Sequence, residues 1–191
     1  EPSEQNAHPH VCHERVAVVH NGIIENHDAL RAQQQQGGYR FTSQTDSEVI
    51  VHQIDHYLEQ GKDLLEAVRL TVADLEGAFA LGVINKEEPG RMIAARRGSP
   101  LVVGIADDEM LIASDIAALV AETQQFVFLQ DGDVADIRHS GMTVNDEHGV
   151  EVERPVQTST VTADATDKGD YAHYMLKEIF EQPRAIADTL E

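Results

Sequence analysis

The hydrophobic pattern of this chain changes its period near residue 78, and this change limits the possible folds more than any other feature. Before it, the segments 47–60 and 63–75 repeat apolar residues every three or four positions, which predicts two amphipathic helices. After it, short apolar runs separated by turn residues predict strands over 79–84, 92–95, 101–105, 110–113, 126–129 and 134–137. Short connections imply antiparallel pairing. Helices followed by antiparallel strands predict an α+β fold.

The first part of the chain predicts one further strand and one short helix. The apolar run 16–19 predicts a buried strand over 15–20, because small and β-branched residues in a row suit a sheet that is covered on both faces. A helix is expected from near Asn26, a good N-cap residue, to the glycine pair at 37–38.

Two dipeptides, Asn21-Gly22 and Asp131-Gly132, predict tight turns. The first follows the strand of the N-terminal part, and it is expected to turn the chain sharply with a positive φ. The second lies between the last two apolar runs of the chain, and it is expected to join them as a hairpin.

Three regions are expected along the chain. Residues 1–156 form the main domain. Residues 157–170 are rich in Thr, Ala and Asp and have no apolar period, which predicts a linker. Residues 171–191 are expected to begin with a helix over 171–182, and Pro183 is expected to start a new helix because proline is favoured in a first turn.

The composition excludes several classes of partner. With 14 basic and 34 acidic residues, the formal net charge is −20, and such a surface repels a phosphate backbone, so no nucleic acid partner is expected. No apolar run approaches the length of a membrane span, so no membrane partner is expected. The single cysteine, Cys12, excludes an intrachain disulfide and fits a reducing compartment, which predicts a cytoplasmic location.

A side-chain amide and a backbone N–H are expected to lie together at Asn21 and Gly22, at the end of a strand. Two aimed N–H donors are what an acyl-transfer enzyme needs to hold a developing oxyanion. Asn-Gly after a strand is also the ordinary sequence of a turn, so the residues themselves leave both interpretations open.

Several specific motifs occur in order along nearly the whole chain. They are N-A-H-P-H at 6–10, V-V-H-N-G-I-I-E-N at 18–26, T-D-S-E-V-I at 45–50, R-R-G-S-P at 96–100 and H-Y-M-L-K-E-I-F-E-Q-P at 173–183. This order resembles the glutaminase domain of class II (N-terminal nucleophile) glutamine amidotransferases, and it is most similar to that of the glucosamine-6-phosphate synthases. The resemblance implies the four-layer α/β/β/α sandwich of N-terminal nucleophile hydrolases, here incomplete at the N-terminus.

The resemblance also implies roles for individual residues. Asn21 would give a side-chain N–H and Gly22 a backbone N–H to the oxyanion, and Gly22 would also contact the substrate. Asp46 matches the carboxylate that pairs with the α-ammonium group of glutamine. The spacing alone favours another role for this region, because Thr45-x-x-Glu48 is a capping-box pattern and Asp46 could cap the following helix.

The reaction is likewise implied by the resemblance. Residues 1–156 would be part of a class II glutaminase domain that hydrolyses glutamine and passes ammonia to fructose 6-phosphate, and 171–191 would start the connection to a sugar-phosphate isomerase domain. The product would be glucosamine 6-phosphate. The family nucleophile is an N-terminal cysteine, whereas residue 1 is Glu and Cys12 is internal. A chain truncated at both ends and inactive alone is therefore expected, with no cofactor, and as a homo-oligomer when full length.

Two other functions remain open. One is the glutaminase domain of another class II amidotransferase, such as amidophosphoribosyltransferase or asparagine synthetase, although the motif at 173–183 argues against it. The other is a non-catalytic module that binds glutamine or a partner protein, which the absence of the nucleophile favours for the chain as given.

The histidines offer a rival interpretation as metal ligands. The segment 8–13 contains three histidines and Cys12, and His52 and His56 lie four residues apart on one expected helix. Both patterns could bind zinc or nickel. No second ligand cluster shows metal spacing, however, and His52 and His56 lie off the apolar stripe, where they are expected to face water. No metal is therefore expected.

Overall fold

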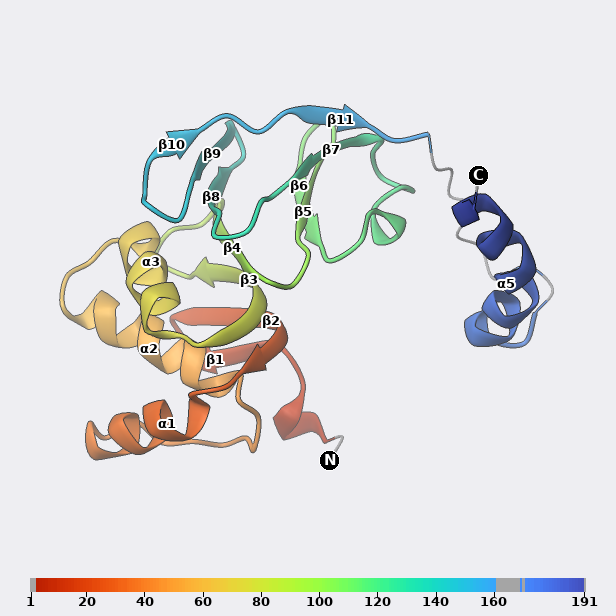
Figure 1. Cartoon of the computed structure of the whole chain (residues 1–191). Coiled ribbons are helices and arrows are strands. Elements are labelled where there is room, and N and C mark those ends of the chain that lie inside the picture. The colour runs from red at the N-terminus through yellow and green to blue at the C-terminus, as the bar shows by residue number, and fades with distance from the viewer. Residues whose placement is uncertain (1–2, 161–168, 170, 191) are drawn as a thin grey trace.

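A computed structural model describes residues 3–160, 169 and 171–190 (Figure 1). Its helices are η1 (Glu4–Asn6), α1 (His27–Gln36), α2 (Glu48–Glu59), α3 (Leu64–Asp74), η2 (Ile116–Ala118) and α5 (Tyr174–Leu190). Its strands are β1 (His10–Cys12), β2 (Val16–Ile24), β3 (Gly77–Asn85), β4 (Arg91–Arg97), β5 (Val102–Ile105), β6 (Met110–Ala113), β7 (Gln125–Phe128), β8 (Val134–Arg138), β9 (Gly141–Asn145), β10 (Glu151–Val152) and β11 (Val156–Thr158).

The strands form two antiparallel sheets. The large sheet has seven strands in the order β1-β2-β3-β4-β8-β9-β10, and the small sheet has four in the order β11-β7-β5-β6. Helices α1, α2 and α3 lie together on one side of the large sheet (Figure 1). Helices in one layer and antiparallel strands in two others confirm the predicted α+β class.

Three buried clusters separate four layers. The first joins α1–α3 to the large sheet, the second lies between the two sheets, and the third joins the outer face of the small sheet to η2 and the residues after it. The sheets approach closely at Gly82 of β3, where an added Cβ would lie 2.5 Å from Ile112 Cδ1 of β6. The expected α/β/β/α sandwich is thus confirmed, with a fourth layer that consists of the short η2 among the residues described here.

The predicted hairpin around Asp131-Gly132 is wrong. β7 belongs to the small sheet and β8 to the large sheet, so this turn carries the chain from one sheet to the other. Gly132 has a φ of +83°, and the buried Asp133 carboxylate accepts hydrogen bonds from Gln130 N–H and from the Arg154 guanidinium. These contacts hold the turn in a shape that separates its two strands.

The C-terminal part differs from the expected organisation. Residues 156–158 form β11 and pair with β7, so the expected linker 157–170 begins inside a strand, and most of it (161–168 and 170) lies outside the described residues. α5 continues through Pro183, where a new helix was expected. Proline within a helix removes one backbone donor, which the rest of this 17-residue helix tolerates.

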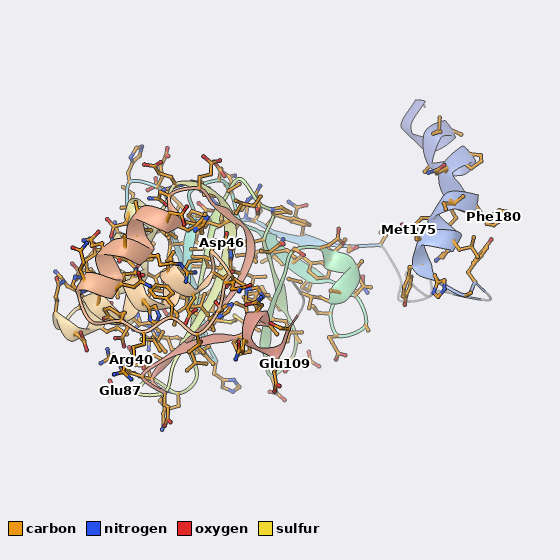
Figure 2. All side chains as sticks on the ribbon, turned by 90° about the horizontal axis from the view of Figure 1, so that it is seen from below. Arg40, Asp46, Glu87, Glu109, Met175 and Phe180 are labelled. Carbon is orange, nitrogen blue, oxygen red and sulfur yellow. The ribbon has the colours of Figure 1, made fainter. Side chains whose placement is uncertain are left out.

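The apolar face of α5 is exposed. Met175 and Phe180 lie on this helix, apart from the two sheets (Figure 2), and their side chains are 71% and 65% exposed. No helix in the described part of the chain is long and apolar enough to cross a membrane.

Candidate active site

Gly22 lies inside β2, where its φ is +144°. β2 continues as one strand and pairs with β3 along all nine of its residues. A Cβ atom at position 22 would lie 2.1 Å from Ala78 O and 2.7 Å from Phe79 Cα, so glycine alone permits this approach. The expected sharp turn at Asn21-Gly22 is therefore wrong, because the glycine serves the pairing of two strands rather than a reversal of the chain.

Within the described residues, no strand pairs with one edge of β2 over residues 19–24, which is called the open edge below. β1 pairs only with the first three residues of β2, and no described strand continues along that edge. Ile24 N–H points to this edge and donates to Asp46 Oδ2 at 2.7 Å. Backbone N–H groups of alternate residues point to the same edge of a strand, so Gly22 N–H points there as well. The Gly22 amide and the Asp46 carboxylate therefore lie along one edge.

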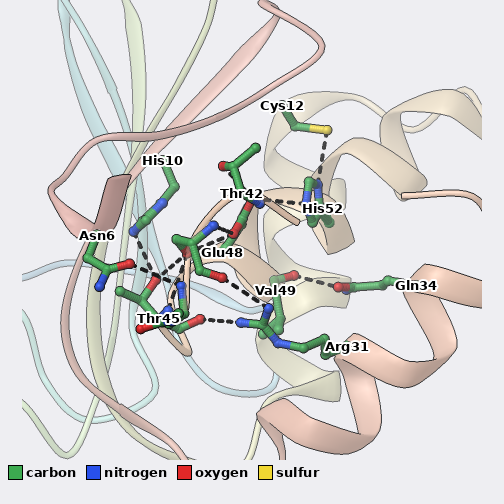
Figure 3. A network of polar contacts seen from close by, with 12 residues as sticks. Asn6, His10, Cys12, Arg31, Gln34, Thr42, Thr45, Glu48, Val49 and His52 are labelled. Carbon is green, nitrogen blue, oxygen red and sulfur yellow. Dashed lines mark hydrogen bonds and ion pairs between the residues drawn. The ribbon is translucent and has the colours of Figure 1, made fainter. Parts of the chain in front are cut away.

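Asp46 stands just before α2 but is not its cap. The N-cap position of α2 makes no side-chain capping bond. Glu48, the last member of the capping-box pattern, instead accepts hydrogen bonds from the N–H groups of Thr42 and Ser43 at 2.8 and 2.7 Å (Figure 3). Burial favours the neutral form of Glu48, but these bonds outweigh it and hold the pKa of Glu48 below its ordinary value. The Asp46 carboxylate is thereby left to contact β2.

Three histidine side chains contact hydroxyl groups in the turn before α2. His8 Nε2 and His20 Nδ1 lie 3.3 and 2.8 Å from Ser47 Oγ, and His10 Nε2 lies 3.0 Å from Thr45 Oγ1 (Figure 3). Burial lowers the pKa of His10 and of His20, so both rings are neutral at pH 7. They hold the turn through hydrogen bonds rather than through charge, and this turn carries Asp46.

Asn21 lies on the opposite face of β2 from the buried His20, because side chains alternate along a strand. It is exposed and lines a cavity of about 150 Å³ between the two sheets, together with Ile112. The structure thus brings Gly22 and Asp46 to one edge of β2 and places Asn21 next to Gly22. The expected convergence of the Asn21 and Asp46 side chains on one cleft stays a prediction.

Residues 2–121 match the family model described as glutamine amidotransferase domain. The chain belongs to this family.

Curated relatives of this amidotransferase domain are about half identical to it. The chain is 51% identical over 191 residues to a glutamine–fructose-6-phosphate aminotransferase (isomerizing) of Shewanella oneidensis. This alignment covers 100% of the chain and 31% of that relative. It is 50% identical over 188 residues to the enzyme of the same name from Acidithiobacillus ferridurans, covering 98% of the chain and 31% of the relative. The chain therefore spans about a third of the length of these relatives.

Solved structures share the fold of the domain. The glutamine phosphoribosylpyrophosphate amidotransferase of Bacillus subtilis, in complex with ADP and GMP, is 25% identical with a TM-score of 0.65 over 75% of this chain and 32% of that chain. A glutamine aminotransferase class-II domain protein from Silicibacter pomeroyi is 19% identical with a TM-score of 0.54, over 74% of this chain and 70% of that chain. The second likeness concerns the fold alone.

Arg31 of the amidotransferase domain also holds the turn before α2, and the sequence did not single it out. Its guanidinium donates to Ser43 O at 3.2 Å and to Thr45 O at 2.6 Å (Figure 3), and it lies 4.2 Å from the centre of the Phe41 ring. No spacing in the sequence links Arg31 to these carbonyl groups. His20 had a weak signal, since it directly precedes Asn21.

His52 is buried, so the expectation that it faces water is wrong. Its side of α2 lies against β1 and the loop after α1, and the residue is only 4% exposed. His52 Nδ1 lies 3.2 Å from Cys12 Sγ (Figure 3), and the ring packs against Tyr39 and Phe41. His56, one turn later, is exposed as expected.

Cys12 does not have the properties of a nucleophile. It is the single cysteine of the chain, and it is buried. Burial, together with the nearby Asp55 carboxylate, raises the pKa of the Cys12 thiol to about 12. Because the thiolate is the reactive form of cysteine, Cys12 is unreactive at neutral pH.

Proposed function

We propose that this chain supplies the glutamine-hydrolysing part of an amidotransferase, and that the ammonia passes to fructose 6-phosphate to give glucosamine 6-phosphate. The main support for a glutamine-binding site is that the Asp46 carboxylate and the Gly22 N–H lie along the open edge of β2. The acceptor is supported by 51% identity over the whole chain with an enzyme named for fructose 6-phosphate.

Asp46 binds the α-ammonium group of glutamine in this proposal. Its Oδ2 atom is held by Ile24 N–H, which fixes the plane of the carboxylate without neutralising its charge. The residue is half-buried, so an ion pair formed there is stronger than one in open water. The amino-acid end of glutamine is thereby anchored, and the amide end extends along β2 towards Gly22.

Gly22 and Asn21 stabilise the oxyanion. Attack on the side-chain amide carbon of glutamine moves negative charge to the amide oxygen, and the Gly22 N–H and the Asn21 amide N–H donate to that oxygen. These contacts strengthen as charge develops, so they favour the transition state over the bound substrate. The resemblance assigns the attack to the thiolate of an N-terminal cysteine, and the buried Cys12 takes no part.

A chimeric enzyme tests the proposal. Residues 1–191 would replace the matching segment of the Shewanella oneidensis relative, with which they align from end to end. We expect the chimera to release ammonia from glutamine and to form glucosamine 6-phosphate. Glutamate and glucosamine 6-phosphate would be measured in the same reactions, and thermal unfolding would show that the chimera is folded.

A folded chimera that forms no glutamate from glutamine would contradict the glutamine site. A folded chimera that hydrolyses glutamine but delivers no nitrogen to fructose 6-phosphate would contradict the acceptor. That second outcome would favour the glutaminase domain of a different class II amidotransferase. The phosphoribosylpyrophosphate amidotransferase, which shares the fold of this chain, is an example of that alternative.

A further inference from the structure

A cluster of side chains that can ligate a metal lies away from the open edge of β2, where the turn between β1 and β2 meets α2. One potential ligand atom from each of Cys12, His13 and Asp55 lies within 4.8 Å of the other two. Cys12 and Asp55 are buried, and His13 is exposed. Asp55 lies more than two helical turns from Asp46, so this cluster is separate from the proposed glutamine site.

The backbone of the turn directs His13 into this cluster. His13 and Glu14 have φ values of +49° and +51°, which are uncommon for residues other than glycine. This conformation forms part of the three-residue turn between β1 and β2 and places the His13 ring against α2, with Nδ1 2.9 Å from Asp55 Oδ2. An exposed imidazole is thus held next to a fully buried carboxylate.

Two neighbours orient the Asp55 carboxylate. Arg15 Nη2 donates to Oδ1 at 2.7 Å, and Tyr39 Oη donates to Oδ2 at 3.1 Å. Burial favours the neutral acid, but the contacts with Arg15 and Tyr39 outweigh it and hold the pKa of Asp55 below its ordinary value, so the group is a carboxylate. Such outer contacts are what fixes a ligating carboxylate in known metal sites.

His52 supports the cluster on its other side. Its Nδ1 atom lies 3.2 Å from Cys12 Sγ, and its Nε2 atom is buried with no hydrogen-bond partner in the described part of the chain, Glu48 Oε1 being 3.6 Å away. The His52 side chain lines a cavity of about 300 Å³ together with Cys12 and His13. A buried imidazole thus contacts the thiol through Nδ1, next to a cavity through which an ion can enter.

We propose that Cys12, His13 and Asp55 bind a divalent transition-metal ion, zinc above all, with the fourth position open to this cavity. Sulfur, imidazole and carboxylate are the donors that tetrahedral zinc takes, at bond lengths of about 2.0–2.3 Å. Such bonds place the donor atoms roughly 3.3–3.6 Å apart, so separations in the cluster, which are within 4.8 Å, need to change by at most about 1.5 Å. Binding releases the thiol proton of Cys12 to solvent, and the His52 Nδ1–H donates to the thiolate.

The charges around the cluster suit a dication. The Cys12 thiolate and the Asp55 carboxylate balance the ion, and Glu59 Oε1 lies 4.0 Å from His13 Nδ1, which offsets the neighbouring Arg15 guanidinium. The net charge of −20 over the chain adds a favourable long-range field. The bound ion would clamp the β1–β2 turn to α2.

Zinc titration of the 191-residue chain by calorimetry tests the site. We expect one ion per chain, with affinity reduced at least tenfold in His13→Asn and in Cys12→Ser. Asparagine tolerates the positive φ at position 13, so the first variant removes the ligand and keeps the turn. His56→Asn is the matched control, because His56 is an exposed histidine on the same helix as Asp55. The zinc affinity of this variant should equal that of the parent chain.

Cobalt(II) provides a second readout. We expect a sulfur-to-cobalt charge-transfer absorption in the parent chain and in His56→Asn that is lost in Cys12→Ser, and zinc should raise the melting temperature of the parent chain more than that of His13→Asn. The proposal is overturned if no ion binds, if Cys12→Ser and His13→Asn bind as the parent does, or if the sulfur–cobalt absorption is missing. An equal loss in His56→Asn would also overturn it, because binding would then be surface chelation.

Discussion

The Asp46 carboxylate accepts the Ile24 backbone N–H at 2.7 Å, and this bond joins the turn before α2 to the open edge of β2. The turn is held independently by Arg31 and by His20, which contact its carbonyl and hydroxyl groups. A carboxylate that is fixed in this way loses little freedom when a cation binds to it, which favours affinity.

We predict that Asp46→Asn raises the KM for glutamine at least tenfold in the chimera, with a smaller effect on kcat. Asparagine keeps an oxygen for Ile24 N–H and removes the charge, so the variant isolates the ion pair with the α-ammonium group. The ammonium contact exists before the reaction begins, which is why KM should respond. Steady-state kinetics measure both constants, and Asp28→Asn, at an exposed carboxylate on α1, is the control. An unchanged KM in Asp46→Asn would remove Asp46 from the site.

Asn21→Ala should act in the opposite way. Loss of one oxyanion donor typically lowers kcat by about 10²–10³, because the contact is strongest in the transition state. We therefore expect kcat to fall within this range while KM changes little. Gln35→Ala, at an exposed amide on α1, should be neutral in the same assay. A rise in KM without loss of kcat in Asn21→Ala would show that its amide binds glutamine in the ground state.

Gly22→Ala should destabilise the fold by about 3 kcal/mol or more, because it combines backbone strain with overpacking. The added Cβ would lie 2.1 Å from Ala78 O, which is backbone and cannot move aside. Gly90 is the matched control, since its φ is +79° and nothing lies within 4 Å of its added Cβ. Urea unfolding should show that Gly90→Ala costs only the strain, about 1–2 kcal/mol. Equal losses at the two positions would contradict the clash with β3.

The buried His20 should make stability depend on pH. Burial lowers its pKa below the ordinary 6.5, with Asp46 opposing and His8 and His10 adding to the shift. The unfolded chain therefore binds more protons than the native chain below pH 6.5, and stability falls as the pH falls from 6.5. The contribution of one such group is at most about 1.4 kcal/mol per pH unit.

Urea unfolding at pH 7.5 and pH 5.5, with a metal chelator present, measures this effect. His20→Asn places an amide near the position of Nδ1, so it keeps a partner for Ser47 Oγ and removes the titration. We expect the loss of stability between the two pH values to be smaller in His20→Asn than in the parent chain. His148→Asn, at an exposed histidine, should match the parent. Equal losses in all three proteins would show that His20 does not titrate differently on folding.

The sequence predicts the helices well because their signals are local. Ile50, Ile54 and Leu58 mark the stripe of α2, and Asp63 caps α3 by accepting Glu66 N–H, as a helix start requires. The separation of β7 and β8 into different sheets could not be predicted in the same way, because the apolar runs on either side of a turn indicate two strands but not which strands they pair with. Sheet membership there depends on contacts with distant strands.

Likewise, the sequence identifies some residues of the candidate site and not others. Gly22 and Asp46 belong to recognisable motifs, and the sequence identifies them. The residues around them do not belong to such motifs. Arg31 contacts the turn before α2 from another helix, and the burial of His52 depends on how α2 packs. The Asn-Gly dipeptide has the composition of a turn, and only the close approach of β3 shows why its glycine is needed.

The chain passes between its two sheets three times, after β4, β7 and β10. β4 pairs directly with β8 in the large sheet, although the segment that builds β5–β7 of the small sheet lies between them in the sequence. Contacts so distant in sequence make folding slow and bind the two sheets into one cooperative unit. Excision of either sheet would leave a chain that lacks half of its shared core.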